Sequence, residues 1–248
     1  MEMVVGIIMD YNKVYKNYIK KSNDFTYIFD KTYLKEFENL KNKNILDIGC
    51  GEGRFAFTCS KKGAKVDAID VSSKLIDFAK EYNYSKNINY YNLDFGNVDI
   101  NKFKSKKYDF IVINMVLLNI FSEKKVTNIF EKCYKLLNKN GILAFSDLNP
   151  ICKACDESYP HRVNIFPKIF SYYKKGSKYS AILKFNSEKI EFKNKHWRLQ
   201  DYTNFLVKNN MYIYKIIEPS YSNTNKINSY LKNLKFPEFI IFFSKKLK

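Results

Sequence analysis

The sequence predicts an α/β fold in which a mostly parallel sheet carries helices on both faces. Between residues 44 and 148, short apolar runs alternate with amphipathic segments. Apolar runs of this length are typical of strands that are buried on both faces, and their alternation with helices indicates parallel pairing. Three glycines at alternate positions follow the first apolar run, which is expected where a strand turns tightly into a helix.

The first half of this region predicts three strands and two helices. We expect strands at 44–49, 64–70 and 88–94, separated by helices at 54–63 and 72–84. Gly63 is the expected C-cap of the first helix, because glycine readily takes the left-handed conformation that ends helices. Ser72 or Ser73 is the expected N-cap of the second, because a serine hydroxyl accepts from the free N–H groups of a first turn.

The second half predicts a strongly apolar fourth strand at 108–116 and a fifth at 141–148. A long amphipathic helix at 122–141 joins them, with Ser122 as its cap and Gly141 just past its end. Before residue 44, aromatic and aliphatic residues recur at helical spacing over 10–40. That pattern predicts about two N-terminal helices.

The alternation of strands and helices stops at residue 149. Residues 149–178 show no clear period, 179–197 predict a hairpin, 199–210 a helix, and 211–219 and 238–247 two further strands. Long irregular segments in compact domains often cover a binding site. We therefore expect one domain over 1–248, made of an N-terminal helical cap (1–43), a ligand-binding core (44–148), an insertion and hairpin forming a substrate lid (149–195), and a C-terminal part of the sheet (196–248).

Composition narrows the possible partners and the compartment. The formal net charge is +18, yet only three of the 43 basic residues are arginine, the residue that binds phosphates in bidentate fashion. Nucleic acid is therefore a possible partner that we do not favour. The five cysteines show no disulfide framework, and the pair Cys152 and Cys155 lacks the further ligands of a zinc site. We expect no metal, no membrane span, no signal peptide and a cytoplasmic protein.

The strand ends carry the residues from which we infer a ligand. Gly49, Gly51 and Gly53 follow the first strand, and Asp47 precedes them in the pattern D-x-G-x-G-x-G. A carboxylate there suits an ammonium group. Asp70 ends the second strand, where an acid accepts hydrogen bonds from ribose hydroxyls. At the third strand end, the pair Asp94–Phe95 offers an acceptor for an exocyclic amine and a ring for a purine.

These residues resemble the class I S-adenosylmethionine-dependent methyltransferases. The matching stretches are ILDIGCGEGRFAF, KVDAIDVSSKLIDFAKE, INYYNLDF, YDFIVINMVLLNI and LLNKNGILAFSDLNP. The resemblance implies a Rossmann-like seven-stranded sheet with an antiparallel last strand, and S-adenosylmethionine as a cofactor that leaves as S-adenosylhomocysteine. It also implies a cofactor-binding set made of Asp47, Gly49, Cys50, Gly51, Gly53, Asp70, Val71, Asp94, Phe95, Asn114 and Met115.

The methyl acceptor is less well determined by the sequence. His196 and His161 are the candidate bases, Arg198 could hold an anionic group of a substrate, and Tyr11 and Tyr15 could close over the site. The tetrad after the fourth strand is NMVL, which differs from the Asn-Pro-Pro-Tyr type found in enzymes that N-methylate adenine, cytosine or glutamine. We expect a small-molecule acceptor methylated at oxygen or nitrogen by a monomer or homodimer. The alternatives are a tRNA or rRNA methyltransferase and a non-catalytic cofactor-binding regulator.

Overall fold

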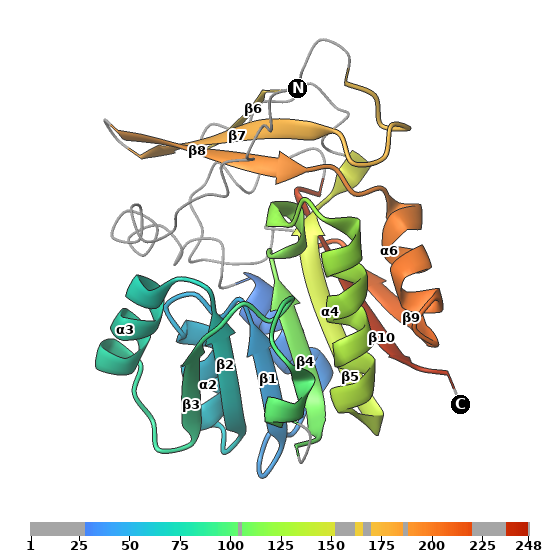
Figure 1. Ribbon diagram of the computed structural model, residues 1–248. Helices are drawn as coiled ribbons and strands as arrows, with labels where there is room; N and C mark the ends of the chain where they lie inside the picture. Colours follow the sequence, from blue (N-terminus) through green and yellow to red (C-terminus); the bar gives the residue numbers. More distant parts are fainter. Residues whose placement is uncertain are drawn as a thin grey trace.

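The computed structural model describes residues 28–103, 106–151, 162–165, 170–185, 188–219 and 237–247. Its main sheet has seven strands in the order β3-β2-β1-β4-β5-β10-β9 (Figure 1). The strands are β1 (Asn44–Ile48), β2 (Lys65–Asp70), β3 (Ile88–Asn92), β4 (Tyr108–Asn114), β5 (Leu137–Leu148), β9 (Met211–Ile217) and β10 (Phe239–Lys246). The strands β1 to β5 pair with one another in parallel, and β10 is antiparallel to both β5 and β9. The Rossmann-like sheet is therefore confirmed.

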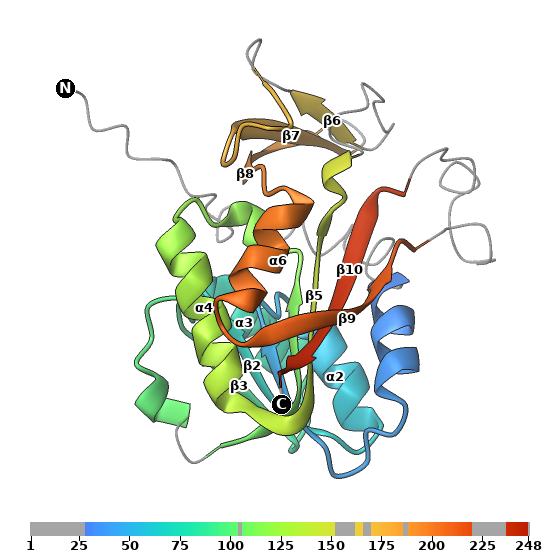
Figure 2. The same ribbon diagram turned by 90° about the vertical axis from the view of Figure 1, so that its right-hand side faces the viewer.

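Helices cover both faces of this sheet (Figure 2). The helix at 28–37, α2 (Arg54–Lys61) and α3 (Ser73–Tyr82) contribute side chains to one apolar cluster. The helices α4 (Glu123–Leu136) and α6 (Leu199–Val207) pack into a second cluster on the opposite face. Because both faces of β1 and β4 are covered, their near-continuous apolar sequences are explained.

Two predicted caps are present, and one predicted helix end is wrong. The hydroxyl of Ser72 accepts from Leu75 N at 3.3 Å, and that of Ser122 accepts from Lys125 N at 3.2 Å. However, α4 ends at Leu136, and β5 starts at once with the buried residue Leu137, which pairs with Tyr108. Gly141 therefore lies inside β5, because strand pairing prevails over the helical pattern of this segment.

A second sheet of three antiparallel strands lies over the carboxyl ends of the main sheet in both views (Figures 1 and 2). It consists of β6 (Arg162–Ile165), β7 (Lys178–Phe185) and β8 (Glu188–Lys195). The hairpin of β7 and β8 matches the prediction. Strand β6 falls in the segment expected to be irregular, and its four residues are too few to show a period in the sequence.

The helix at 28–37 confirms one of the expected N-terminal helices, and the remainder of that expectation lies outside the described residues. Phe29, Tyr33 and Phe37 form a buried aromatic row along it, with ring centroids 6.5 and 6.1 Å apart. No helix in the described part of the chain has the length and apolar character needed to cross a membrane.

Candidate functional site

The turn between β1 and α2 lies at the carboxyl edge of the sheet. Gly49, Gly51 and Gly53 all have positive φ angles, of 75°, 56° and 77°. The N–H groups of Gly49 and Cys50 donate to the Ile69 carbonyl at 2.7 and 3.0 Å, which ties this turn to the end of β2. Side chains other than glycine rarely adopt such angles, so the three-glycine pattern follows from the backbone path itself.

Close packing within the protein is a second reason for two of these glycines. A Cβ atom on Gly49 would lie 2.2 Å from Val116 Cγ2, and one on Gly53 would lie 2.5 Å from the Tyr90 hydroxyl. Glycines at the end of a strand can also serve to let a ligand approach the backbone closely. At these two positions, protein side chains occupy that space, and the backbone rather than a ligand makes glycine necessary.

Asp70 connects the end of β2 to the glycine turn. Its Oδ2 accepts from Gly51 N at 2.9 Å, and its Oδ1 accepts from Ser72 N at 2.8 Å. Burial raises the pKa of Asp70, although the N–H groups of Ser72 and Gly51 oppose this effect. The next residue, Val71, is 55% exposed although it is apolar, so it offers an uncovered surface beside the carboxylate.

Asp47 is buried beneath the same turn and is only 2% exposed. Its Oδ2 has no hydrogen-bond partner among the described residues. Burial raises the pKa of Asp47 to about 8, and the negative charges of Asp30 and Asp70 add to the effect. A buried carboxylate oxygen without a partner is costly, and a positive ligand group placed against it would remove that cost.

The helix at 28–37 contributes site residues that the sequence analysis missed. Asp30 is buried and forms a two-bond ion pair with Arg54, the first residue of α2, in which Nη2 lies 3.0 Å from Oδ1. Tyr33 is 1% exposed, and its hydroxyl donates to Asn114 Oδ1 at 3.3 Å. Two features of the sequence point to these residues: an acidic residue beside aromatic residues at helical spacing, and an arginine directly after the last glycine of the turn.

Asn114 ends β4 and is held by two donors. Besides Tyr33, the hydroxyl of Ser146 on β5 donates to its Oδ1 at 2.6 Å. Both contacts involve the carboxamide oxygen, so the orientation of the amide group is fixed. The following residue, Met115, has a φ angle of 57°, which is unusual for a residue other than glycine. Such strained positions cluster at functional sites.

Asp94 and Phe95 lie farther along the same edge, after β3. The Asp94 carboxylate accepts from Gly96 N at 3.1 Å and from Lys125 Nζ at 2.5 Å. Phe95 is 3% exposed and belongs to the apolar core, and the Lys132 ammonium lies 5.7 Å from its ring centroid. Their contacts with an adenine remain predictions, and Lys125 already pairs with Asp94.

His196 is fully buried directly after β8. Its Nε2 lies 3.0 Å from the Tyr172 carbonyl oxygen, which can only accept, so Nε2 carries the proton. The imidazole also packs edge-on against the rings of Phe170 and Tyr172, both 5.2 Å away. These contacts give His196 an anchoring role for the segment at 170–177, and its role as a base stays a prediction.

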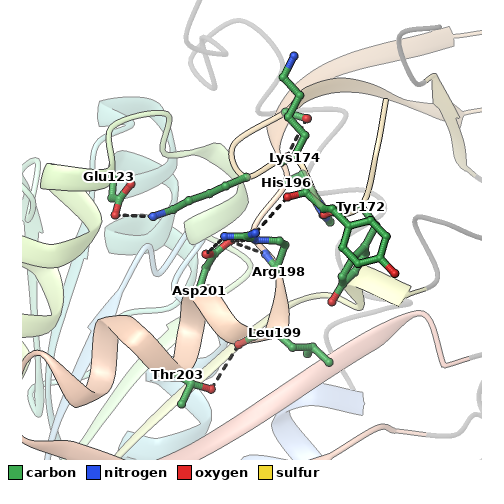
Figure 3. A network of polar contacts seen from close by, with 11 residues as sticks. Glu123, Tyr172, Lys174, His196, Arg198, Leu199, Asp201 and Thr203 are labelled. Carbon is green, nitrogen blue, oxygen red and sulfur yellow. Dashed lines mark hydrogen bonds and ion pairs between the residues drawn. The ribbon is translucent and has the colours of Figure 1, made fainter. Parts of the chain in front are cut away.

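Arg198 is engaged within the protein at the start of α6 (Figure 3). Its Nε and Nη2 donate to Asp201 at 3.0 and 2.8 Å, and its Nη1 donates to the Tyr173 carbonyl at 3.0 Å. Nearby, Lys175 pairs with Glu123 of α4 at 2.6 Å. The guanidinium thus fastens the segment at 170–177 to α6, and substrate binding by Arg198 remains a prediction. Tyr11, Tyr15 and His161 lie outside the described residues.

A separate cavity of about 290 Å³ lies at the opposite edge, near the amino ends of β1, β2 and β4. Its buried carboxylate, Asp67, accepts from Lys106 at 2.7 Å, from the Tyr108 hydroxyl at 2.7 Å and from Asn89 at 2.9 Å. Because these donors already satisfy Asp67, this carboxylate offers no unpaired charge to a ligand. Among the described residues, no cluster of histidine, cysteine and acidic side chains could hold a metal ion.

Comparison with known proteins agrees with this arrangement. The family described as "Methyltransferase domain" matches residues 45–141. A ubiquinone biosynthesis O-methyltransferase of Coxiella burnetii is 32% identical over 124 residues, which are 49% of this chain and 50% of that protein. A malonyl-[acyl-carrier protein] O-methyltransferase of Ilyobacter polytropus is 31% identical over 137 residues, which are 54% of this chain and 47% of that protein.

The chain spans about half the length of the curated relatives that it matches. Among solved structures, an S-adenosylmethionine-dependent methyltransferase from Clostridium acetobutylicum superposes with a TM-score of 0.64. That alignment covers 96% of this chain and 99% of the other, at 17% identity. At this identity the likeness supports the fold, and it extends the agreement beyond the segment that the sequence relatives share.

Proposed function

We propose that the chain is a class I S-adenosylmethionine-dependent methyltransferase that transfers a methyl group to an oxygen or nitrogen of a small-molecule acceptor, since a methyltransferase domain matches residues 45–141. The observation that carries the proposal is the group formed by Asp47, Gly51 and Asp70 at the carboxyl ends of β1 and β2. A buried carboxylate oxygen without a partner lies there beside a left-handed glycine turn, which a second carboxylate holds in place.

The residues at this edge fit the parts of S-adenosylmethionine, which supplies an electrophilic methyl group on a sulfonium centre. Asp47 would face the ammonium group of the methionyl part. Asp70 would accept hydrogen bonds from the ribose, since each carboxylate oxygen can accept more than the one bond it now makes. The exposed side chain of Val71 would lie against the nucleoside and lose its contact with water.

Methyl transfer depends more on the alignment of the methyl donor with the acceptor than on the movement of a proton. Holding two reactants in line replaces an encounter in solution with a step inside one complex. The rigid elements for this are present: Asn114 is fixed by Tyr33 and Ser146, and the Asp30–Arg54 pair fastens the helix at 28–37 to α2. An oxygen or protonated nitrogen acceptor also needs a base, for which His196 and His161 are the candidates.

Oxygen is the more strongly supported of the two acceptor atoms. Both relatives described above are named O-methyltransferases, and one of them acts in ubiquinone biosynthesis. The second sheet, β6-β7-β8, lies over the carboxyl ends where the methyl group would be presented (Figure 1). Aromatic side chains of this region, Tyr172 and Tyr179 among those described, favour an apolar or aromatic acceptor.

Calorimetry followed by an activity screen tests the proposal. We expect the protein to bind S-adenosylmethionine and to transfer its isotope-labelled methyl group to a component of a small-metabolite extract. Binding without turnover on any extract would favour the non-catalytic regulator. Labelling of tRNA or rRNA, with affinity falling steeply as salt rises, would favour the alternative that the net charge of +18 suggests. A protein that binds neither the cofactor nor its product would contradict the proposal.

A further inference from the structure

Among the described residues, more negative than positive charge acts on the Asp47 carboxylate. The charged side chains that face its carboxylate are Asp30 from the helix at 28–37, Glu52 from the glycine turn, Arg54 from α2 and Asp70 from β2. Among these described groups, three carboxyl groups raise the pKa of Asp47 and one guanidinium lowers it. The shortest contacts of Arg54 go to Asp30, and its Nε lies 4.0 Å from Glu52 Oε1, so the guanidinium is directed to these two carboxylates rather than to Asp47.

The other titratable groups near Asp47 add no charge at neutral pH. They are Tyr33 of the helix at 28–37, Cys50 of the turn, Cys59 of α2 and Tyr90 of β3. Burial is the main cause that raises the pKa of each of them, so each stays protonated. Like charges that cannot all be ionised at short range retain a proton on the member with the poorest stabilisation. That member is Asp47, because its Oδ2 accepts no hydrogen bond.

We propose that Asp47 carries a proton in the empty site and releases it to solvent when the cationic head of the cofactor binds. The inference rests on the proposed function and adds a property to it. The O–H bond of the carboxyl group breaks, the proton leaves with solvent buffer, and the carboxylate faces the ammonium. Asp47 thereby determines specificity, because only a ligand with a positive group at this place stabilises the ionised form.

This coupling has a defined dependence on pH. Burial and the neighbouring carboxylates set the pKa of the empty site at about 8, and a bound cation lowers it. Below that pKa the protein must lose a proton to bind, so the affinity rises with pH by roughly tenfold per unit. Between pH 6 and 7 the ammonium of the ligand stays charged, since α-amino groups titrate near 7.7–8.0. The increase in this window therefore reports on Asp47.

The experiment uses S-adenosylhomocysteine, which carries the ammonium group and undergoes no transfer. Titration calorimetry at pH 7 in buffers of different ionisation enthalpy counts the net protons released, and we expect most of one proton per site. The affinity should rise about tenfold from pH 6 to pH 7. A second probe, 5′-methylthioadenosine, shares the nucleoside and sulfur but lacks the ammonium. It should bind without proton release and with no change in affinity over this range.

Variants assign the proton to a residue. Asp47→Asn should bind S-adenosylhomocysteine with no proton release and a flat pH profile. Asp67→Asn is the matched control, because Asp67 is also buried but lies at the opposite edge with four donor residues. It should release the same number of protons as the wild type.

Two results would overturn the inference: S-adenosylhomocysteine binding to the wild type without proton release, or proton release that persists in Asp47→Asn. Either would leave the proposed function standing. Failure of the wild type to bind both S-adenosylmethionine and S-adenosylhomocysteine would instead contradict the proposed function.

Discussion

Asp30 and Arg54 are joined by two hydrogen bonds, which fasten the helix at 28–37 to the first turn of α2. The Asp30 carboxylate is 9% exposed and the Arg54 side chain 25% exposed, so water screens this pair only partly. The pair lies beside the glycine turn and Asp47. Any ligand bound at that turn therefore has the N-terminal helix as a fixed neighbour.

Removing one member of this pair should lower both stability and cofactor affinity. Asp30→Asn removes the carboxylate that pairs with the Arg54 guanidinium. We expect the free energy of unfolding to fall by about 3 kcal/mol. This value is at the low end of the range for breaking a buried ion pair, because the Arg54 side chain is partly exposed. Denaturant unfolding measures this loss. Arg54→Gln combined with Asp30→Asn should recover part of it. Additive losses in the double variant would show that the two residues are not coupled.

Asp70→Ala should weaken cofactor binding strongly. The substitution removes the acceptor for the ribose and also leaves the N–H groups of Gly51 and Ser72 without their acceptor. We expect roughly a 100-fold loss of affinity by calorimetry, equivalent to about 2.7 kcal/mol. The fold should persist with a lower melting temperature, since the loop loses two hydrogen bonds. Unchanged affinity in a folded variant would rule out Asp70 as a cofactor residue.

Gly49→Ala should be destabilising for two separable reasons. A residue with a Cβ at a φ angle of 75° lowers the free energy of unfolding by about 1–2 kcal/mol. The contact at 2.2 Å between the new Cβ and Val116 lowers it by a further amount of about 1–3 kcal/mol through overpacking. Gly176→Ala is the control, because its φ angle is 74° and its Cβ would meet only the flexible end of Lys195. Equal losses in unfolding free energy for the two variants would show that Val116 moves aside without cost.

Asp201 should make stability depend on pH in the acid range. Burial raises the pKa of this carboxyl, but the hydrogen bonds from Arg198 outweigh it and hold the pKa below its usual value. The stabilisation is therefore present above the pKa of the unfolded chain and is lost as the pH falls through the folded pKa. Asp201→Asn should lower the melting temperature at pH 7, and the difference from the wild type should shrink below about pH 4. A constant difference at all pH values would contradict this linkage.

His196→Gln separates the anchoring role from the role of a base. A glutamine amide can still donate to the Tyr172 carbonyl, whereas it cannot take up a proton. If the side chain only anchors the segment at 170–177, turnover should stay within a few-fold of the wild type while His196→Ala loses both stability and turnover. If His196 is the base, both variants should lose turnover with little change in cofactor affinity.

Much of the sheet could be predicted from local sequence, because its strands are short apolar runs and the helices α3 and α4 begin at serine caps. Asp47, the glycines and Asp70 could be proposed as site residues because they lie at or just after strand ends at fixed spacing. The Asp30–Arg54 and Tyr33–Asn114 contacts could not, since each joins residues at least 24 positions apart through tertiary packing. The end of α4 was misjudged for the same reason, because pairing between β4 and β5 determines it.

The antiparallel strand β10 lies between β5 and β9, so the strand nearest the carboxyl terminus occupies an interior position of the sheet. During synthesis on a ribosome, β5 therefore keeps one unpaired edge until residues 239–246 emerge. The apolar side chains of Phe242 and Phe243, both at most 1% exposed in the finished fold, also reach the two cores at that late moment. Nascent chains of this protein should acquire protease resistance in one late step rather than gradually with length.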